Sequence, residues 1–217
     1  MLYCIYMKLL LTSAGIMNQT LAEGLISLLE VPLHEVKIGF IPTAANVEEG
    51  NKDWFIDQIT NLQKYGFNWI DIIDISVPSV DWQDRLESVD VVCISGGNTF
   101  YLLDQVRRTK FDVWLEKNKN SKIYLGMSAG SIIMTPTIAV ASVDNGDINF
   151  DGLKNLQGLN FVDFEISPHT PENVSHIANK KYLKTSKNKL YAIDNETGIK
   201  ILSGNVEVLS EGQWLLY

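Results

Sequence analysis

Apolar residues in the N-terminal part of the chain fall into short runs that alternate with longer amphipathic segments. The runs are rich in Ile, Val and Leu, which is typical of strands covered on both faces. The segments between them have helical length, and in one of them Trp54, Phe55 and Ile59 recur at helical spacing. The expected strands are Lys8–Ser13, Val36–Pro42, Trp69–Ile75, Val89–Ser95 and Lys122–Met127, and the expected helices are Asn18–Leu29, Glu48–Tyr65, Thr99–Val106 and Phe111–Asn118.

This alternation predicts five β/α units and an α/β fold, with a mostly parallel central sheet and helices on both faces. After Thr135-Pro136 the pattern changes to strand-like stretches and turns, with one helix expected at Pro171–Lys184. These stretches indicate antiparallel additions in the C-terminal third. Since no linker or internal repeat interrupts the chain, residues 1–217 are predicted to form a single domain. The strand-like stretches are Ile138–Ala141, Phe161–Ile166, Leu190–Ile193, Gly198–Leu202, Val206–Leu209 and Gln213–Leu216.

Composition narrows the function classes. Eighteen Lys and Arg stand against 26 Asp and Glu, and the net charge of -8 repels nucleic-acid phosphates and anionic lipids. We therefore expect neither a nucleic-acid nor a membrane partner. The two cysteines, Cys4 and Cys93, form no CxxC pair, so the sequence indicates neither a thiolate zinc site nor a disulfide framework, and it favours the reduced cytoplasm. The stretch Met1–Leu11 lacks a basic leader and is interpreted as a tail followed by the first strand.

The fifth expected strand runs into Gly126-Met127-Ser128-Ala129-Gly130, which matches the G-x-S-x-G nucleophile elbow. In such an elbow a tight strand-to-helix turn leaves the serine hydroxyl exposed above the sheet, and small neighbours allow the close approach of the backbone. A plain tight turn would give the same pentapeptide, and its place after a buried strand leaves the turn and the nucleophile as equal alternatives. A second glycine-bearing loop, Ser95–Thr99, follows the fourth strand and also reaches the edge where ligands bind in open α/β sheets.

A serine nucleophile needs a base, and the chain has three histidines. His34 lies in a polar turn, and His176 falls inside an expected helix. His169 follows a strand-like segment and lies between two prolines, so it is the favoured base. Turn residues that could orient its ring are Asp144, Asp147, Asp194, Asn195 and Glu196.

Three segments occur together in a characteristic order: GGNTFYLL from Gly96, GMSAG from Gly126, and SPHT around His169. With Pro42-Thr43-Ala44 after the second strand, they resemble the family of peptidase E and cyanophycinase. The resemblance extends from the first strand to about Leu202. It implies a fold similar to that of the class I glutamine amidotransferases, which is flavodoxin-like.

The resemblance also implies roles for individual residues. Ser128 would be the nucleophile, His169 the general base, and the backbone amides of Gly97 and Ala129 the oxyanion donors. Asp144 stands where peptidase E has an aspartate needed for activity.

The chain departs from the family pattern in the turn Ile193-Asp194-Asn195-Glu196. Family members often place a glutamate there as the partner of the histidine, whereas Asn195 holds that place in this sequence. Either Asn195 orients the imidazole as a neutral amide, or Glu196 does so after a shift by one residue.

The implied activity is that of a serine peptidase without cofactor or metal, which hydrolyses small peptides through an acyl-enzyme. Dipeptides with N-terminal aspartate are the family's substrates, and the paired Arg107 and Arg108 are more typical of a solvated helix face than of a carboxylate pocket. An α/β-hydrolase esterase is an alternative, although the HGG-type oxyanion segment that it requires is not found. A catalytically inactive small-molecule binding module is the other. Oligomeric state stays open, with a homodimer as one option.

Overall fold

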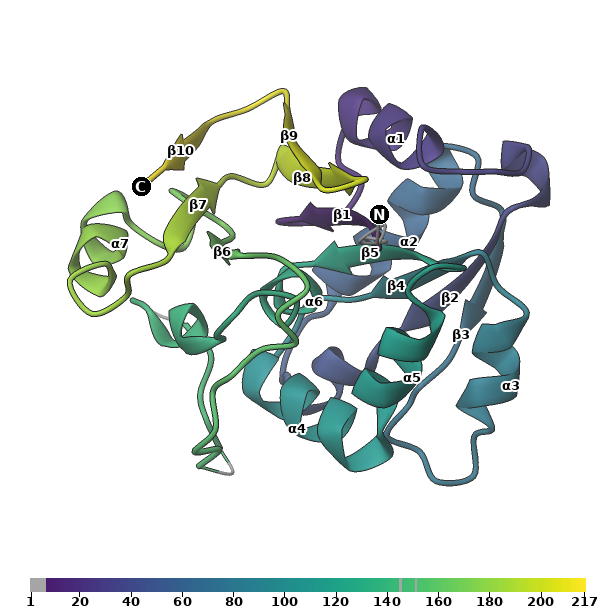
Figure 1. The fold of residues 1–217 in the computed structure, drawn as a ribbon, viewed down its shortest axis with the longest axis horizontal. Helices are drawn as coiled ribbons and strands as arrows, with labels where there is room; N and C mark the ends of the chain where they lie inside the picture. Colours follow the sequence, from purple (N-terminus) through teal and green to yellow (C-terminus); the bar gives the residue numbers. More distant parts are fainter. Residues whose placement is uncertain (1–6, 145, 151) are drawn as a thin grey trace, which may run out of the picture.

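The computed structural model describes residues 7–144, 146–150 and 152–217. Its larger sheet has seven strands in the order β3-β2-β4-β5-β1-β8-β9 (Figure 1). The first five of these strands are parallel to their neighbours, whereas β8 and β9 pair antiparallel. The predicted mostly parallel sheet is therefore confirmed. The strands are β1 (Lys8–Thr12), β2 (Lys37–Ile41), β3 (Trp69–Ile72), β4 (Val91–Ile94), β5 (Ile123–Met127), β8 (Thr197–Leu202) and β9 (Asn205–Ser210).

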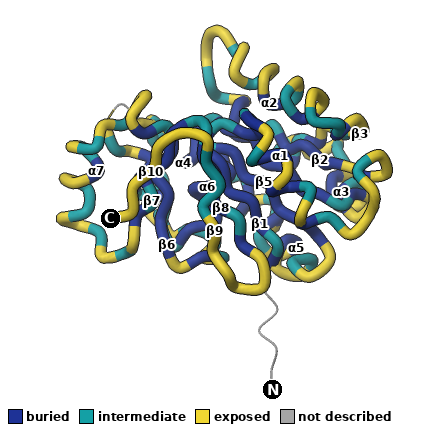
Figure 2. Tube along the Cα trace, turned by 90° about the horizontal axis from the view of Figure 1, so that it is seen from above, coloured by how far each residue is buried: buried dark blue, intermediate teal, exposed yellow. Residues whose placement is uncertain are grey.

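Helices cover both faces of this sheet because its strands alternate apolar side chains to either side. On β1, Leu10 joins the apolar layer beneath α1 and α2, whereas Leu9 and Leu11 join the layer beneath α3 to α6. Figure 2 shows buried positions along the central strands such as β1 and β5, whereas α2 and the strands β9 and β10 carry mainly exposed positions. The helices are α1 (Gln19–Ile26), α2 (Asp53–Lys64), α3 (Trp82–Glu87), α4 (Thr99–Thr109), α5 (Phe111–Asn118), α6 (Ala129–Ile132) and α7 (His176–Tyr182).

A smaller sheet carries the C-terminal third of the chain. It consists of β6 (Phe164–Ser167), β7 (Lys189–Ile193) and β10 (Trp214–Leu216), with β7 in the middle. The antiparallel expectation holds for the pairings β1–β8, β8–β9 and β7–β10, whereas β6 and β7 are parallel. The fully buried carboxylate of Glu165 on β6 accepts hydrogen bonds from Tyr182, Ser186 and Asn188 at 2.5 to 2.7 Å. This carboxylate ties α7 and the following turn to β6.

Some boundaries differ from the expectations. The stretch Ile138–Ala141 was expected as a strand but forms a 3-10 turn at Ala139–Ser142, because a short apolar run fits either conformation. The helix expected at Pro171–Lys184 is limited to α7, since a turn occupies its first residues. Helix α3 was not predicted. Two further 3-10 turns lie at Leu33–Glu35 and Thr43–Val47.

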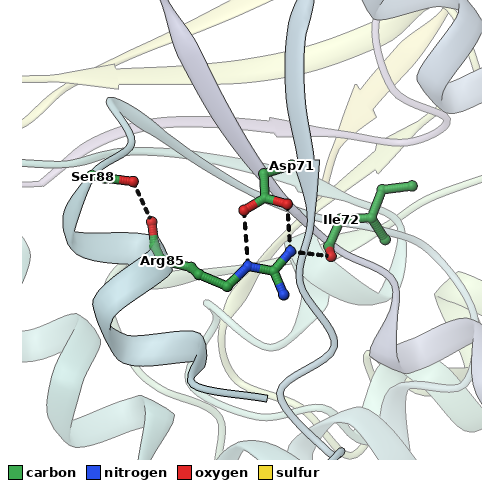
Figure 3. A network of polar contacts seen from close by, with 4 residues as sticks. All are labelled: Asp71, Ile72, Arg85 and Ser88. Atoms are coloured by element: carbon green, nitrogen blue, oxygen red, sulfur yellow. Dashed lines mark hydrogen bonds and ion pairs between the residues drawn. The ribbon is translucent and has the colours of Figure 1, made fainter.

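Helix α3 is attached to the edge strand β3 by one arginine (Figure 3). Arg85 Nε donates to Asp71 Oδ2 at 2.9 Å, its Nη2 contacts the other carboxylate oxygen, and Nη2 also donates to the carbonyl of Ile72 at 2.8 Å. This last bond occupies a backbone acceptor on the open edge of the sheet, which protects the edge from pairing with another strand.

No helix in the described part of the chain is long and apolar enough to span a lipid bilayer. The expected N-terminal tail before the first strand falls on residues 1–6, which lie outside the described residues.

Candidate active site

The carboxyl ends of β1, β4 and β5 meet at one edge of the larger sheet. The register pairs Thr12 with Met127 and Ile94 with Gly126, so the loops that follow these strands begin side by side. The elbow serine, Ser13 and the Gly96-Gly97 turn therefore come from adjacent strands, at the edge where ligands bind in open α/β sheets.

Ser128 is held in a strained elbow between β5 and α6. Its φ of 49° and ψ of -108° lie where non-glycine residues are uncommon, as expected of a nucleophile elbow. The strain is balanced by hydrogen bonds, because Ser128 N donates to the carbonyl of Thr12 at 3.0 Å and Ser131 Oγ donates to the same carbonyl at 2.7 Å. Gly130 allows the turn to close, since a methyl group there would collide with the carbonyl of Ile94.

His169 approaches Ser128 from the end of β6, in the smaller sheet. Its Nε2 lies 2.9 Å from Ser128 Oγ. The histidine has a left-handed backbone with φ 57°, its N–H donates to Ser13 Oγ at 2.8 Å, and its carbonyl accepts bonds from the backbone N–H groups of Asn173 and Val174. These contacts fix the ring position that a general base toward Ser128 requires.

The other ring nitrogen of His169 faces an amide. Nδ1 lies 2.6 Å from Asn195 Oδ1, and Ser13 Oγ donates to that same oxygen at 3.2 Å. An amide oxygen only accepts, so Nδ1 carries the proton and Nε2 is left with a lone pair toward the hydroxyl of Ser128. The geometry thus selects the tautomer that can take a proton from the serine.

The other candidates for the third member lie elsewhere. Glu196 Oε2 accepts a hydrogen bond from Asn18 at 3.1 Å, and Asp194 caps the turn by accepting from Thr197 Oγ1 at 2.6 Å. Asp144, in an exposed turn, accepts from the backbone N–H of Ser175 at 3.1 Å, and the bonds of the imidazole go to Asn195 and Ser13 instead. The contacts therefore favour Asn195 over Asp144 and Glu196, because among these three candidates Asn195 is the one whose side chain contacts the ring.

The remaining histidines and the paired arginines make contacts away from Ser128. His34 is exposed beside Glu35, and His176 Nδ1 lies 2.9 Å from the hydroxyl of Tyr217. Arg107 donates to the carbonyls of Asn155 and Gln157, whereas Arg108 pairs with Asp104 at 2.6 Å.

Two backbone N–H groups are free beside Ser128. Within the described residues, neither Gly97 N nor Ala129 N donates a hydrogen bond to another group of the chain. Gly97 lines the same cavity as Ser128, and a methyl group on it would overlap the backbone of Ala44. Its φ of 128° also favours glycine. Of the two residues, Gly97 lines the cavity and Ala129 is buried directly after the serine.

The cavity around Ser128 and His169 has a volume of about 480 Å³. This size falls within the range of small-molecule sites. Burial lowers the pKa of His169 below its usual 6.5, although the bond to Asn195 and the charge of Glu172 act in the opposite direction. The ring is therefore neutral near pH 7, as a general base must be. Among described residues, no group of three or more His, Cys, Asp or Glu side chains could hold a metal ion.

Two site residues escaped the sequence analysis. Ser13 contacts both His169 and Asn195, and Gln58 of α2 lines the cavity. Neither belongs to a recognisable motif. The only available signal for Ser13 was its position directly after a buried parallel strand.

An elbow serine hydrogen-bonded to a histidine at the carboxyl edge of an α/β sheet defines the class of serine hydrolases. Residues 9–209 match the family model described as Peptidase family S51. The chain belongs to this family and is a serine peptidase of the peptidase E type.

Similar proteins agree with this assignment. An uncharacterized peptidase of Pasteurella multocida, PM1590, is 33% identical over 77% of this chain and 85% of its own length. A peptidase E of a Nostoc species is 31% identical over 61% of this chain and 52% of its own. A crystal structure from Listeria monocytogenes, assigned provisionally to peptidase E, superposes with a TM-score of 0.77 at 30% identity, covering 95% of this chain and 99% of that one.

Proposed function

We propose that this peptidase hydrolyses small peptides through Ser128, His169 and Asn195. The observation that carries the proposal is the continuous set of contacts from Ser128 Oγ to His169 Nε2 at 2.9 Å and from His169 Nδ1 to Asn195 Oδ1 at 2.6 Å. A cavity of about 480 Å³ accommodates a short peptide better than a folded protein loop.

In the proposed reaction, Ser128 Oγ attacks the carbonyl carbon of the scissile amide while His169 Nε2 takes its proton. The carbonyl oxygen gains negative charge beside the N–H groups of Gly97 and Ala129. His169 then gives the proton to the leaving amine, which departs as the C–N bond breaks. Water, deprotonated by the same imidazole, cleaves the acyl ester and restores the serine.

Asn195 has a different role from that of a carboxylate. It holds the ring in the productive tautomer but adds no negative charge to stabilise the imidazolium. In the proposed mechanism, Asn195 therefore supports His169 by orienting the ring and not by charge. Dipeptides with N-terminal aspartate belong in the first substrate panel, because the family resemblance implies them and because they are small enough for the cavity.

The test is labelling with a fluorophosphonate probe, followed by hydrolysis of a dipeptide panel and of a short acyl ester. We expect labelling and peptide cleavage by the natural chain, with both lost in Ser128→Ala. Ser142→Ala, which removes an exposed hydroxyl in a 3-10 turn, is the matched control and retains both. Ester turnover without peptide cleavage, or labelling that survives Ser128→Ala, would contradict the proposal.

A further inference from the structure

The cavity beside Ser128 is lined by acidic side chains. Glu48, Asp57 and Asp147 contribute to its wall, and no Lys or Arg is among the lining residues. None of the three carboxylates forms a salt bridge with a described residue. Lys52 is close enough to act on Glu48, but its ammonium group donates to the carbonyl of Ala45 at 2.8 Å and lies outside the lining. The wall is therefore acidic, and no basic side chain lines it.

Burial raises the pKa of two of these carboxyl groups, Glu48 and Asp147. The pKa of Glu48 is raised by burial and then by the neighbouring Asp147, and the pKa of Asp147 is raised by burial. One oxygen of Asp147 accepts the backbone N–H of Thr99 at 2.7 Å. Burial disfavours the ionised form of these carboxyl groups, and a cation bound beside them favours it.

Gln58 is a second, independent sign of a missing ligand. Its side chain is 4% exposed and lines the cavity, and its Oε1 has no hydrogen-bond partner among the described residues. A side-chain carbon on Gly96 would lie 3.2 Å from Gln58 Nε2 and 3.3 Å from Ser128 Cβ, so the amide lies next to the elbow serine. Buried polar groups are nearly always paired, and an amide with a free oxygen can turn that oxygen toward a ligand N–H.

From this lining we infer that the cavity binds the positively charged group of the substrate, an alkylammonium or guanidinium next to the scissile amide, rather than a side-chain carboxylate. Glu48 and Asp147 face this group, Asp57 adds charge at the exposed rim, and Gln58 accepts one further N–H. The inference rests on the proposed function, because it names the substrate of that site. A net charge of -8 also draws cations toward the protein.

The positive charge has two chemical sources, a basic side chain and the free α-amino group of a short peptide. Four ligands separate them: lysinamide, its Nε-acetyl form, its Nα-acetyl form and aspartic acid α-amide. Calorimetry on Ser128→Ala gives their dissociation constants without turnover. Hydrolysis of the corresponding aminoacyl coumarin amides by the natural chain gives kcat/KM.

We expect lysinamide to bind at least about tenfold more tightly than one of its acetylated forms, and the acetyl group that weakens binding identifies the source. Glu48→Gln and Asp147→Asn should each reduce this ratio by about threefold to tenfold. Asn can still accept from Thr99, so the second variant keeps the fold. Glu48→Lys should invert the preference toward the aspartic acid amide. The control Glu35→Gln removes an exposed charge before β2, at the opposite edge of the sheet, and should leave every ratio unchanged.

Tighter binding of the aspartic acid amide by Ser128→Ala, or equal binding of all four ligands, overturns the inference. Either result would leave the proposed function intact, provided that the natural chain cleaves peptides and Ser128→Ala does not. Conversely, a natural chain that is neither labelled nor active on peptides, but whose Ser128→Ala variant prefers lysinamide, would contradict the proposed function and preserve the inference.

Discussion

Replacing Asn195 by Asp tests whether the imidazole of His169 is oriented by a neutral group. The substitution keeps the shape of the side chain, and within the described chain Asn195 Nδ2 donates no hydrogen bond that would be lost. The new carboxylate would take the place of Oδ1, which lies 2.6 Å from Nδ1. It would therefore stabilise the protonated ring directly.

The expected shift in the pKa of His169 follows from the new charge and from its burial. Unit charges about 4 Å apart interact by about 4 kcal/mol at an effective dielectric constant of about 20. Part of this is offset by the burial of the new carboxylate, and opposite charges in contact usually shift a pKa by about 1 to 3 units. The amide already favours the charged ring to some degree. We therefore expect Asn195→Asp to raise the pKa of His169 by about 1 to 2 units, or about 1.4 to 2.7 kcal/mol.

The assay is the rate of fluorophosphonate labelling of Ser128 as a function of pH. In the natural chain the acid limb should have its midpoint below 6.5, since burial lowers the pKa of His169 and the base acts only when neutral. In Asn195→Asp the midpoint should move upward by the amount given above. Asn173→Asp places the same charge on the cavity wall without a hydrogen bond to the ring, so its shift should be below about 0.5 units. Equal shifts in the two variants, or none in Asn195→Asp, would refute the reasoning.

Three further substitutions probe the supports of the site. Ser13→Ala leaves the N–H of His169 without its acceptor, so it should slow labelling about tenfold and lower the free energy of unfolding by about 1 to 3 kcal/mol, which a urea titration checks. Glu165→Gln leaves one donor facing the amide NH₂ group and should lower the free energy of unfolding by about 1 to 3 kcal/mol, read as a lower urea midpoint. Gly130→Ala forces a methyl group against the carbonyl of Ile94 and should cost about 1 to 3 kcal/mol and most of the labelling rate. An unchanged midpoint in either of the last two variants would contradict the packing described here.

The parallel part of the fold was predictable because its strands are covered on both faces. Continuous apolar runs such as Val91–Ile94 and Ile123–Met127 carry that burial in the sequence itself. Helix α3 was missed because six residues with two buried side chains give too little periodicity. The 3-10 turn at Ala139–Ser142 was mistaken for a strand because its apolar residues pack against the core through tertiary contacts.

The site was predictable only where chemistry imposes a local pattern. The elbow around Ser128 and the loop before His169 carry such patterns, and the structure brings the two side chains together. The choice between Asp144 and Asn195 depends on which turn reaches the ring, which is decided by the pairing of β7 with β6 and β10. Gln58 looks like an ordinary helix residue in the sequence, since its importance lies only in its place on the cavity wall and in a buried amide oxygen that has no partner among the described residues.

The division of Ser128, His169 and Asn195 between two sheets has a consequence for biosynthesis. Ser128 leaves the ribosome well before His169 and Asn195, and these two are positioned by a sheet whose outer strand, β10, is translated last among the described strands. Under the proposed mechanism, a nascent chain that contains Ser128 but not yet His169 lacks the general base and cannot hydrolyse peptides. Hydrolytic activity then requires the smaller sheet to be folded, so it is acquired only after the last strand of that sheet has been synthesised.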